Sequence, residues 1–317
     1  MDQSQRVLKI EFEKKNNDMT SKGSIWLGLA ATTLALPVAV TQPALAETVK
    51  ITPLGSHDGE FCWFDRAIIL EVAYYERFSK TWWDPVGPFW PLRRLNNLRV
   101  DYLREHICRH FGCDIRAKQP LAGLSVLDVG CGGGTLSEAI ARLGARVTGV
   151  DVVEKNLNIA SSHARQSALV IDYRHTTAEA LAGASERFDV VLNMEVVEHV
   201  ADIDGFLAAS GSLVAPSGIV SVATVNRNLL AWLVAIMGAE HILRWMPQGT
   251  HQYQKLRRPG EIEQRLRTAG LEVFARTGVL VNPFNRSLHL TPFMGINHML
   301  IAARGKKLKI VQIPVVR

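Results

Sequence analysis

Cysteine is scarce in this chain, and its four cysteines, Cys62, Cys108, Cys113 and Cys131, form no C-x-x-C pair. A disulfide-stapled secreted domain has a denser and more regular cysteine pattern, and cysteine-based metal sites have closely spaced pairs. The sequence therefore argues against both kinds of framework. It favours reduced thiols in a cytosolic type of compartment.

Basic residues are in modest excess, but they are not gathered into a run. The 36 Lys and Arg residues outnumber the 30 Asp and Glu residues, which gives a net charge of +6 and a pI of about 9.2. A nucleic-acid groove typically interleaves basic and aromatic side chains, and no such run is present. We therefore expect no nucleic-acid partner. The positive charge is compatible with an anionic membrane surface.

The apolar run at residues 25–40 (IWLGLAATTLALPVAV) is too short to indicate a membrane span. It follows several lysines and precedes an A-x-A pattern, so residues 25–46 resemble a secretory signal. Acidic residues upstream, such as Glu11, are atypical of a signal and of a mitochondrial presequence. Residues 1–73 are expected to be an N-terminal extension of one of two kinds: an export or anchoring segment, removed or retained, or foreign sequence joined by gene fusion or a start-site error.

From about Tyr74 the sequence alternates short apolar segments with helical patterns of about ten to fifteen residues. The expected strands are Ser125–Val129, Arg146–Asp151, Leu169–Arg174, Phe188–Asn193, Gly218–Val225, Leu271–Leu280 and His298–Ala303. We predict one α/β domain over residues 74–305, with a Rossmann-like, mostly parallel sheet of seven strands and helices on both faces. Ligands of such sheets bind at the carboxyl ends of the strands, where the strand order reverses.

Three segments lie outside this alternation. Residues 78–107 are expected to form an N-terminal helical arm, broken by prolines at positions 85, 88 and 91. The apolar segment 228–246 is inserted between the fifth and sixth strands. Residues 306–317 form a basic and apolar tail.

The segment VLDVGCGGGTL (126–136) places a glycine-rich turn between an expected strand and an expected helix. Glycine leaves no side chain between the backbone and a ligand, so Gly130 and Gly132 are expected to bind a cofactor. A pyrophosphate loop would have G-x-G-x-x-G spacing, whereas here the spacing is G-x-G-G-G and the acid Asp128 precedes it. That acid suits an ammonium group, which S-adenosylmethionine has. The alternatives are a nucleotide oxidoreductase and a turn that binds nothing.

Two more residues are expected beside this cofactor. Asp151 ends the second strand, where an acid can accept hydrogen bonds from both ribose hydroxyls. Because NAD enzymes use an acid in the same way, Asp151 does not identify the cofactor. Met194 follows the fourth strand, where its side chain could lie against an adenine.

The stretch FDVVLNMEVVEHV (188–200) supplies groups for chemistry. If the chain is helical after this strand, Glu195, Glu198 and His199 share one face. The two carboxylates suit Mg²⁺, and His199 is suited to be a general base or a less usual metal ligand. Either role would generate a phenolate, since a phenol has a pKa of about 10. The alternative is structural, with Glu195 favouring a helix start and His199 packed in the core.

With these motifs in view, residues 74–304 resemble the ubiquinone biosynthesis O-methyltransferase family, a branch of the class I S-adenosylmethionine methyltransferases. The segments that carry the resemblance are FSKTWWDPVGPFWPLRRLNNLR, VLDVGCGGG, VTGVD, MEVVEHV, TVNRN, GAEHILRWMPQGTH and INHMLIAA, in this order. The resemblance implies methylation of ring hydroxyls on polyprenylated catechol-type intermediates of ubiquinone. The chain departs from the family at Asn97, where bacterial members usually have proline, and at Gln252 and Gln254, where acids usually follow GTH.

The resemblance also implies roles for individual residues. The positions that match cofactor-binding residues of the family are Arg99, Gly130, Asp151 and Met194. The positions that match its magnesium ligands are Glu195, Glu198 and His199. Because Arg99 precedes the sheet, the helical arm is expected to fold over the cofactor and bring a cation towards its carboxylate.

The apolar run within residues 228–246 is about half as long as a membrane span. It is expected to be either a buried cap helix or a lid in the membrane interface, with Trp232 and Trp245 as anchors and Arg244 near the headgroups. A polyprenyl substrate stays in the bilayer. The resemblance thus implies a cytoplasmic enzyme, peripheral on the inner face of the inner membrane (the matrix side in a mitochondrion), within a ubiquinone-biosynthesis complex.

Two other functions stay open on the sequence alone. The first is a methyltransferase for another small phenol or amine. The second is a non-catalytic, membrane-docked scaffold of the same fold. The full set of candidate site residues counts against a scaffold, which has no need of them.

Overall fold

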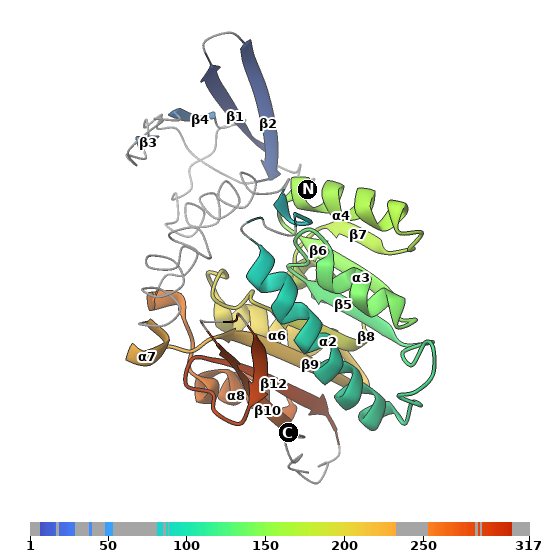
Figure 1. Ribbon diagram of the computed structural model, residues 1–317. Coiled ribbons are helices and arrows are strands. Elements are labelled where there is room, and N and C mark those ends of the chain that lie inside the picture. The colour runs from blue at the N-terminus through green and yellow to red at the C-terminus, as the bar shows by residue number, and fades with distance from the viewer. Residues whose placement is uncertain are drawn as a thin grey trace, which may run out of the picture. The chain divides into compact units, whose positions relative to one another are not determined.

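The strands from residue 125 onward join into one sheet, shown in the computed structural model of Figure 1. The structure describes residues 7–16, 19–28, 38–39, 48–52, 81–84, 87, 89–232, 253–282, 285 and 287–305, and of the first four ranges the backbone alone. The chain divides into two units, residues 1–67 and 68–317.

The first unit contains a small antiparallel sheet in its described part. The strands are β1 (Val7–Asn16), β2 (Met19–Gly28), β3 (Val38–Ala39) and β4 (Thr48–Thr52), in the order β2-β1-β4-β3. Of the signal-like segment 25–46, residues 25–28 belong to β2 and residues 38–39 to β3. The rest of that segment lies outside the described residues, so its role stays a prediction.

The sheet of the second unit confirms the predicted α/β fold. Its described strands are β5 (Ser125–Val129), β6 (Arg146–Asp151), β7 (Asp172–His175), β8 (Phe188–Met194), β9 (Val214–Val225), β10 (Leu271–Val281), β11 (Leu288–Thr291) and β12 (Asn297–Arg304). Their order is β11-β10-β12-β9-β8-β5-β6-β7. The strands from β9 to β7 in this order pair in parallel, and β12 is antiparallel to both of its neighbours.

All seven strands expected from the sequence are present, and the described sheet has an eighth. The strand β11 pairs antiparallel with β10 at one edge. Its four residues are too few for an alternating pattern to distinguish it from a loop. The strand β7 also begins three residues later than expected, at Asp172 rather than Leu169.

Helices cover both faces of this sheet. The described helices are α2 (Trp90–Phe111), α3 (Thr135–Arg142), α4 (Glu154–Gln166), α5 (Ala178–Gly183), α6 (Ile203–Leu213), α7 (Leu229–Ala231) and α8 (Pro259–Thr268), with a 3₁₀ turn at Tyr253–Lys255. One core cluster packs α5, α6 and α8 against the sheet, and a second packs α2 and α3 against the opposite face. The helix α2 crosses in front of the strands in Figure 1.

The helical arm differs from the prediction in how its prolines act. Pro91 lies in the first turn of α2, where a missing N–H removes no helical hydrogen bond. It therefore starts the helix, which then runs unbroken to Phe111, where Gly112 ends it in a left-handed conformation. Pro85 and Pro88 lie outside the described residues.

The path of the chain through the sheet determines where a ligand can bind. From β5 the chain moves to β6 and β7 on one side, and it then returns to β8 on the other side of β5. The strand order therefore reverses between β5 and β8. In open parallel sheets the crevice at the carboxyl ends of two such strands is the usual ligand site.

The expected insertion between the fifth and sixth strands lies between β9 and β10. It begins with the short helix α7, and Asn228 caps this helix by accepting a hydrogen bond from Ala231 N–H at 2.8 Å. Residues 233–252, which include Arg244 and Trp245, lie outside the described residues. Within the described parts of the chain, no helix has the length and apolar character needed to cross a membrane.

Candidate active site

The glycine-rich loop connects the end of β5 to the start of α3. Gly130, Gly132 and Gly134 have positive φ angles of 65°, 53° and 80°, a conformation that side chains other than glycine rarely adopt. A Cβ atom at Gly130 would also lie 2.7 Å from Cγ2 of Val196. The loop therefore requires glycine for its backbone turn and for the close approach of the segment after β8.

Asp151, at the carboxyl end of β6, is joined directly to this loop. Its Oδ2 accepts a hydrogen bond from Gly132 N–H at 2.8 Å, and its Oδ1 accepts one from Val153 N–H at 2.7 Å. The side chain is buried, and burial raises the pKa of its carboxyl. The structure thus brings the two residues that the sequence placed beside one cofactor into contact.

Asp128 lies within β5, just before the loop. Its side chain is 2% exposed, and its Oδ2 accepts a hydrogen bond from Ser137 Oγ of α3 at 2.6 Å. The pKa of Asp128 is raised to about 7, chiefly by burial, with the hydrogen bond from Ser137 lowering it and the nearby Asp151 adding to the rise. A cationic group bound nearby would stabilise the ionised form of this carboxyl.

Arg99 projects from α2 towards the end of β8. Its side chain is 3% exposed and pairs with the carboxylate of Glu195, while its Nη1 is buried without a hydrogen-bond partner. A buried guanidinium with a free donor is set up to bind a further acceptor. The arm therefore places the guanidinium of Arg99 beside Glu195 at the end of β8.

The segment after β8 is a turn, so the helix that would have placed Glu195, Glu198 and His199 on one face does not form. Glu195 has a φ of 58°, its N–H donates to Ala223 O at 2.9 Å, and His199 N–H donates to Val196 O at 2.8 Å. The left-handed backbone at Glu195 stops helical propagation directly after Met194. Met194 itself is buried at the end of β8. His199 is half-buried in the turn.

Glu198 points into the protein from this turn. Its side chain is 3% exposed, and its Oε2 accepts a hydrogen bond from Thr224 Oγ1 of β9 at 2.8 Å. Burial, followed by the nearby Glu195, raises the pKa of Glu198 well above its ordinary value. The carboxyl group is therefore held in a setting that favours its neutral form.

The predicted magnesium ligands are not arranged as a metal site. Among the residues that the structure describes, no three His, Cys, Asp or Glu side chains lie close enough together to hold an ion. Glu195 is engaged by Arg99, and Glu198 is buried against Thr224. The residues in this arrangement do not fit a resident Mg²⁺.

Sequence reasoning missed several residues that complete the site. Ser137 and Thr224 bind the two buried acids, and neither belongs to a motif that signals such a role. Trp82 and Trp83 lie on the glycine loop, although the arm is far from the loop in the sequence. The two consecutive tryptophans in FSKTWWDP could have indicated that this segment packs against the domain, because tryptophan side chains are on average largely buried.

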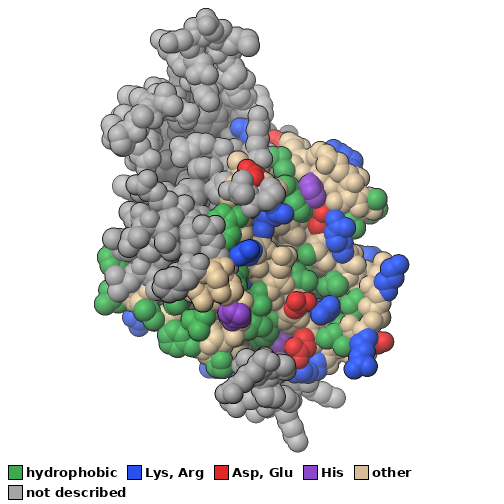
Figure 2. Space-filling model, in the orientation of Figure 1, with side chains coloured by type: hydrophobic (Ala, Val, Ile, Leu, Met, Phe, Trp, Pro, Cys, Tyr) green, Lys and Arg blue, Asp and Glu red, His purple; other side chains and the backbone are tan. Residues whose placement is uncertain are grey.

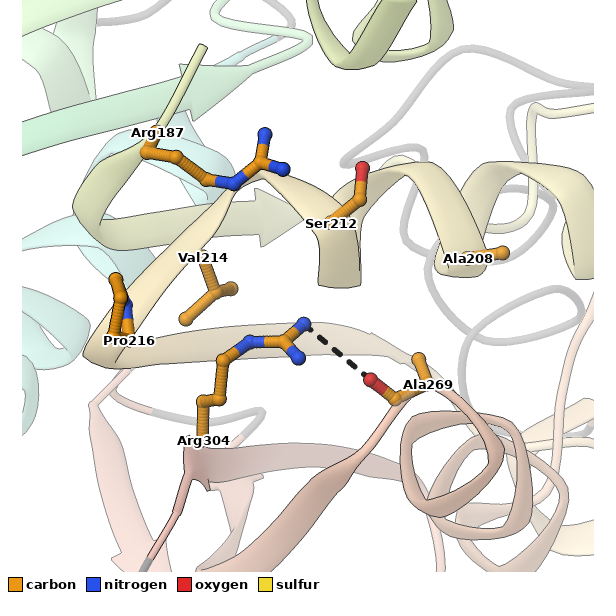
Figure 3. A pocket seen from close by; sticks show the side chains of 7 residues that line it. All are labelled: Arg187, Ala208, Ser212, Val214, Pro216, Ala269 and Arg304. Carbon is orange, nitrogen blue, oxygen red and sulfur yellow. Dashed lines mark hydrogen bonds between the residues drawn. The ribbon is translucent and has the colours of Figure 1, made fainter. Parts of the chain in front are cut away.

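A cavity near the amino ends of β8 and β9 is not a second candidate site. Figure 3 shows its lining around Arg304, whose Nη2 donates to Gly211 O at the end of α6 and to Ala269 O after α8. Arg187 donates to Glu186 O, and Ser212 Oγ donates to Ala209 O at 2.7 Å. Arg304 thus binds carbonyl groups at the ends of α6 and α8, and Arg187 and Ser212 bind carbonyl groups near them in sequence, so these side chains are already engaged by the main chain.

Charges on the face shown in Figure 2 are mixed. Lysine and arginine side chains are interspersed with aspartate and glutamate over the described surface in view. The described residues on this face therefore form no basic stripe of the kind that binds nucleic acid.

Comparison with known proteins places the chain among methyltransferases. The profile of a methyltransferase domain family matches residues 100–275. The ubiquinone biosynthesis O-methyltransferase of Rhizobium leguminosarum bv. trifolii is 51% identical over 238 residues, which is 75% of this chain and 94% of that protein. The one of Sinorhizobium medicae is 52% identical over 234 residues, or 74% of this chain and 94% of that protein.

Solved structures share the fold at low sequence identity. Magnesium protoporphyrin IX methyltransferase from Synechocystis, with bound S-adenosylmethionine, is 18% identical with a TM-score of 0.51, covering 78% of this chain and 100% of that one. The 1,6-didemethyltoxoflavin-N1-methyltransferase of Burkholderia thailandensis is 15% identical with a TM-score of 0.51, covering 79% and 94%. Both likenesses support the class of sheet described above.

Proposed function

The chain belongs to the ubiquinone biosynthesis O-methyltransferase family, and from this membership we propose the reaction of its active site. The protein transfers a methyl group from S-adenosylmethionine to ring hydroxyls of polyprenylated catechol or quinol intermediates of ubiquinone. The contact between Asp151 and Gly132 carries the proposal, because it joins the end of β6 to the glycine loop after β5, which borders the reversal of strand order between β5 and β8.

The donor would lie along this loop. The glycines approach its methionine part, and Asp151 accepts hydrogen bonds from the ribose hydroxyls. Asp128 supplies a negative charge towards the ammonium group, and the free Nη1 of Arg99 is available for the carboxylate. Met194, at the end of β8, lies where an adenine would pack.

Methyl transfer is an in-line displacement at the methyl carbon. The acceptor oxygen forms a bond to this carbon while the carbon–sulfur bond breaks, and sulfur keeps the electron pair as the thioether of S-adenosylhomocysteine. His199 removes the phenolic proton as the general base, because a phenol, with a pKa of about 10, stays largely protonated near neutral pH without one. The described residues do not form a magnesium site, so no step is assigned to a metal.

The acceptor class is tested by measuring kcat/KM for a short-chain prenyl catechol and kcat/KM for catechol itself, at the same donor concentration. The proposal predicts a clear preference for the prenylated compound. Transfer only to unprenylated phenols or to amines would instead identify another small-molecule methyltransferase. Donor binding without transfer to any of these would identify a scaffold.

Donor affinity should depend on pH through Asp128. Its pKa is raised to about 7 before the donor binds, chiefly by burial. Because the donor ammonium favours the ionised carboxyl, the affinity should be constant above about pH 8. Below about pH 7 it should fall by up to about tenfold per pH unit. Calorimetric titration of S-adenosylhomocysteine over a pH series that extends from well below the pKa of Asp128 to above it measures the effect, and Asp128→Asn should flatten the profile.

We also propose that the protein is peripheral on the cytoplasmic face of the inner membrane. Leu229 and Leu230 are 69% and 43% exposed at the start of the insertion. Asn228 Nδ2 donates to Gly295 O at 2.7 Å, so the start of the insertion lies next to the loop before β12. That loop contains Phe293, which is 49% exposed. Exposed apolar side chains gathered at one place favour a lipid or protein contact.

The double variant Leu229→Ser and Leu230→Ser should bind anionic liposomes about tenfold more weakly or worse, because it removes two exposed leucines that would enter the membrane interface. Donor affinity should not change. Val170→Ser is the matched control, since Val170 is 96% exposed before β7, at the other edge of the sheet. Equal liposome binding by all three proteins would refute this membrane contact.

A further inference from the structure

Trp82 lies directly on the glycine loop. Its indole is 6% exposed, although it comes from the arm before α2. A Cβ atom at Gly132 would lie 2.5 Å from Cη2 of Trp82, and one at Gly133 would lie 2.4 Å from its Cγ. The ring and the loop backbone therefore touch only because these residues have no side chains.

The indole N–H of Trp82 reaches beyond the loop to α4. Its Nε1 donates to Asn156 Oδ1 at 2.9 Å in a buried hydrogen bond between residues 74 positions apart. Asn156 is 2% exposed, and its side chain also hydrogen-bonds with Asp151. Trp82, Asn156 and Asp151 thus form a continuous buried chain that ends at the acid on the cofactor loop.

The direction of these hydrogen bonds is determined by chemistry. An indole nitrogen can only donate, so it fixes the oxygen of the Asn156 amide towards Trp82. The NH₂ group of Asn156 must then point to the carboxylate of Asp151. Without the indole donor, the amide could turn over and present its oxygen to Asp151, which would repel the carboxylate.

The neighbouring Trp83 anchors the same segment in a different way. Its Nε1 donates to Gly133 O at 2.8 Å, and its ring stacks on His163 of α4 with centroids 3.4 Å apart. His163 in turn contacts the buried Glu138 of α3 at 2.6 Å. Trp83 therefore anchors the arm on the loop. Among the described residues, its hydrogen bond and ring contact involve neither Asn156 nor Asp151.

We infer that Trp82 is a positioning residue of the donor site, which holds Asp151 in its ribose-binding orientation through Asn156 and closes the glycine loop with its ring. This inference rests on the proposed donor and deepens it, because it makes the arm part of ribose recognition. The methyl-transfer step itself does not involve Trp82, so its loss should change donor affinity and KM but leave kcat near its normal value.

The test uses Trp82→Phe in the full-length protein, because phenylalanine keeps an aromatic ring and removes only the donor N–H and part of the ring. The Kd of S-adenosylhomocysteine should rise about tenfold, the scale of one lost hydrogen bond to a charged network. The wild-type protein should bind S-adenosylhomocysteine much more tightly than its 2′-deoxy analogue, and the variant should lose most of this preference. Asn156→Ala, which leaves the arm intact, should reproduce both effects.

Trp83→Phe is the comparison that separates positioning from simple anchoring. It should weaken donor binding less than Trp82→Phe and should keep the preference for the 2′-hydroxyl. Equal losses in the two tryptophan variants, or an unchanged 2′-deoxy preference in both Trp82→Phe and Asn156→Ala, would overturn the inference. These binding measurements need no methyl transfer, so a failure of the proposed reaction is seen separately in the activity assay.

Discussion

Replacing Asp151 with alanine should raise the Kd of S-adenosylhomocysteine by at least about 100-fold. The change removes the acceptor of two backbone N–H groups, of Gly132 and of Val153, and leaves both without that partner. It also removes the group expected to bind the ribose hydroxyls. Isothermal titration calorimetry measures the loss directly, together with thermal unfolding to show that the protein is folded.

Asp172→Ala is the matched control for this experiment. Asp172 is an acid on the adjacent strand β7, and its Oδ2 accepts a hydrogen bond from Arg174 Nε at 2.7 Å on the surface. Its removal should leave donor affinity within about threefold of the wild type, since exposed ion pairs contribute little. Normal donor binding by a folded Asp151→Ala protein would contradict the assignment of the cofactor loop.

Replacing His199 with alanine should lower kcat by about 10²- to 10⁴-fold, the usual contribution of a general base. Donor affinity should stay unchanged, because none of the donor contacts proposed above involves His199. The residual rate should rise with pH towards the acceptor's own pKa of about 10, since hydroxide then generates the phenolate. Steady-state rates over a pH series measure both effects.

His289→Ala provides the control, because His289 is an exposed histidine on β11.

A second arm of the experiment adds EDTA to the wild-type protein, and the arrangement of Glu195 and Glu198 predicts an unchanged rate. A rate that EDTA abolishes and Mg²⁺ restores would show that Arg99 leaves Glu195 to admit an ion. A normal rate in His199→Ala would show that another group removes the proton.

The parts of the fold that were predicted correctly depend on local sequence. The strands of the parallel core are continuous apolar runs. The glycines at 130 and 132 stand between a strand pattern and a helix pattern, which predicts a tight turn, and both have positive φ angles. Asp128 was identified because it directly precedes the glycine loop, and Asp151 because it ends a strand. Parallel topology then places the ends of adjacent strands at one edge of the sheet.

The features that were missed depend on contacts between distant parts of the chain. The sequence MEVVEH has residues spaced as on a helical face, but Thr224 of β9 holds Glu198, and the main chain of Ala223 accepts from Glu195 N–H. These tertiary bonds override the local helical tendency. The chain Trp82–Asn156–Asp151 likewise joins an arm, a helix and a strand, and no periodic pattern reports such a contact.

The most direct test of the account is to incubate the purified protein with methyl-labelled S-adenosylmethionine and a short-chain prenyl catechol, and to locate the label by mass spectrometry. The account predicts label on a ring oxygen of the catechol, with one S-adenosylhomocysteine formed for each methyl transferred. It also predicts that Asp151→Ala and His199→Ala each remove most of this product. A protein that binds the donor but places no label on oxygen would contradict the proposed function.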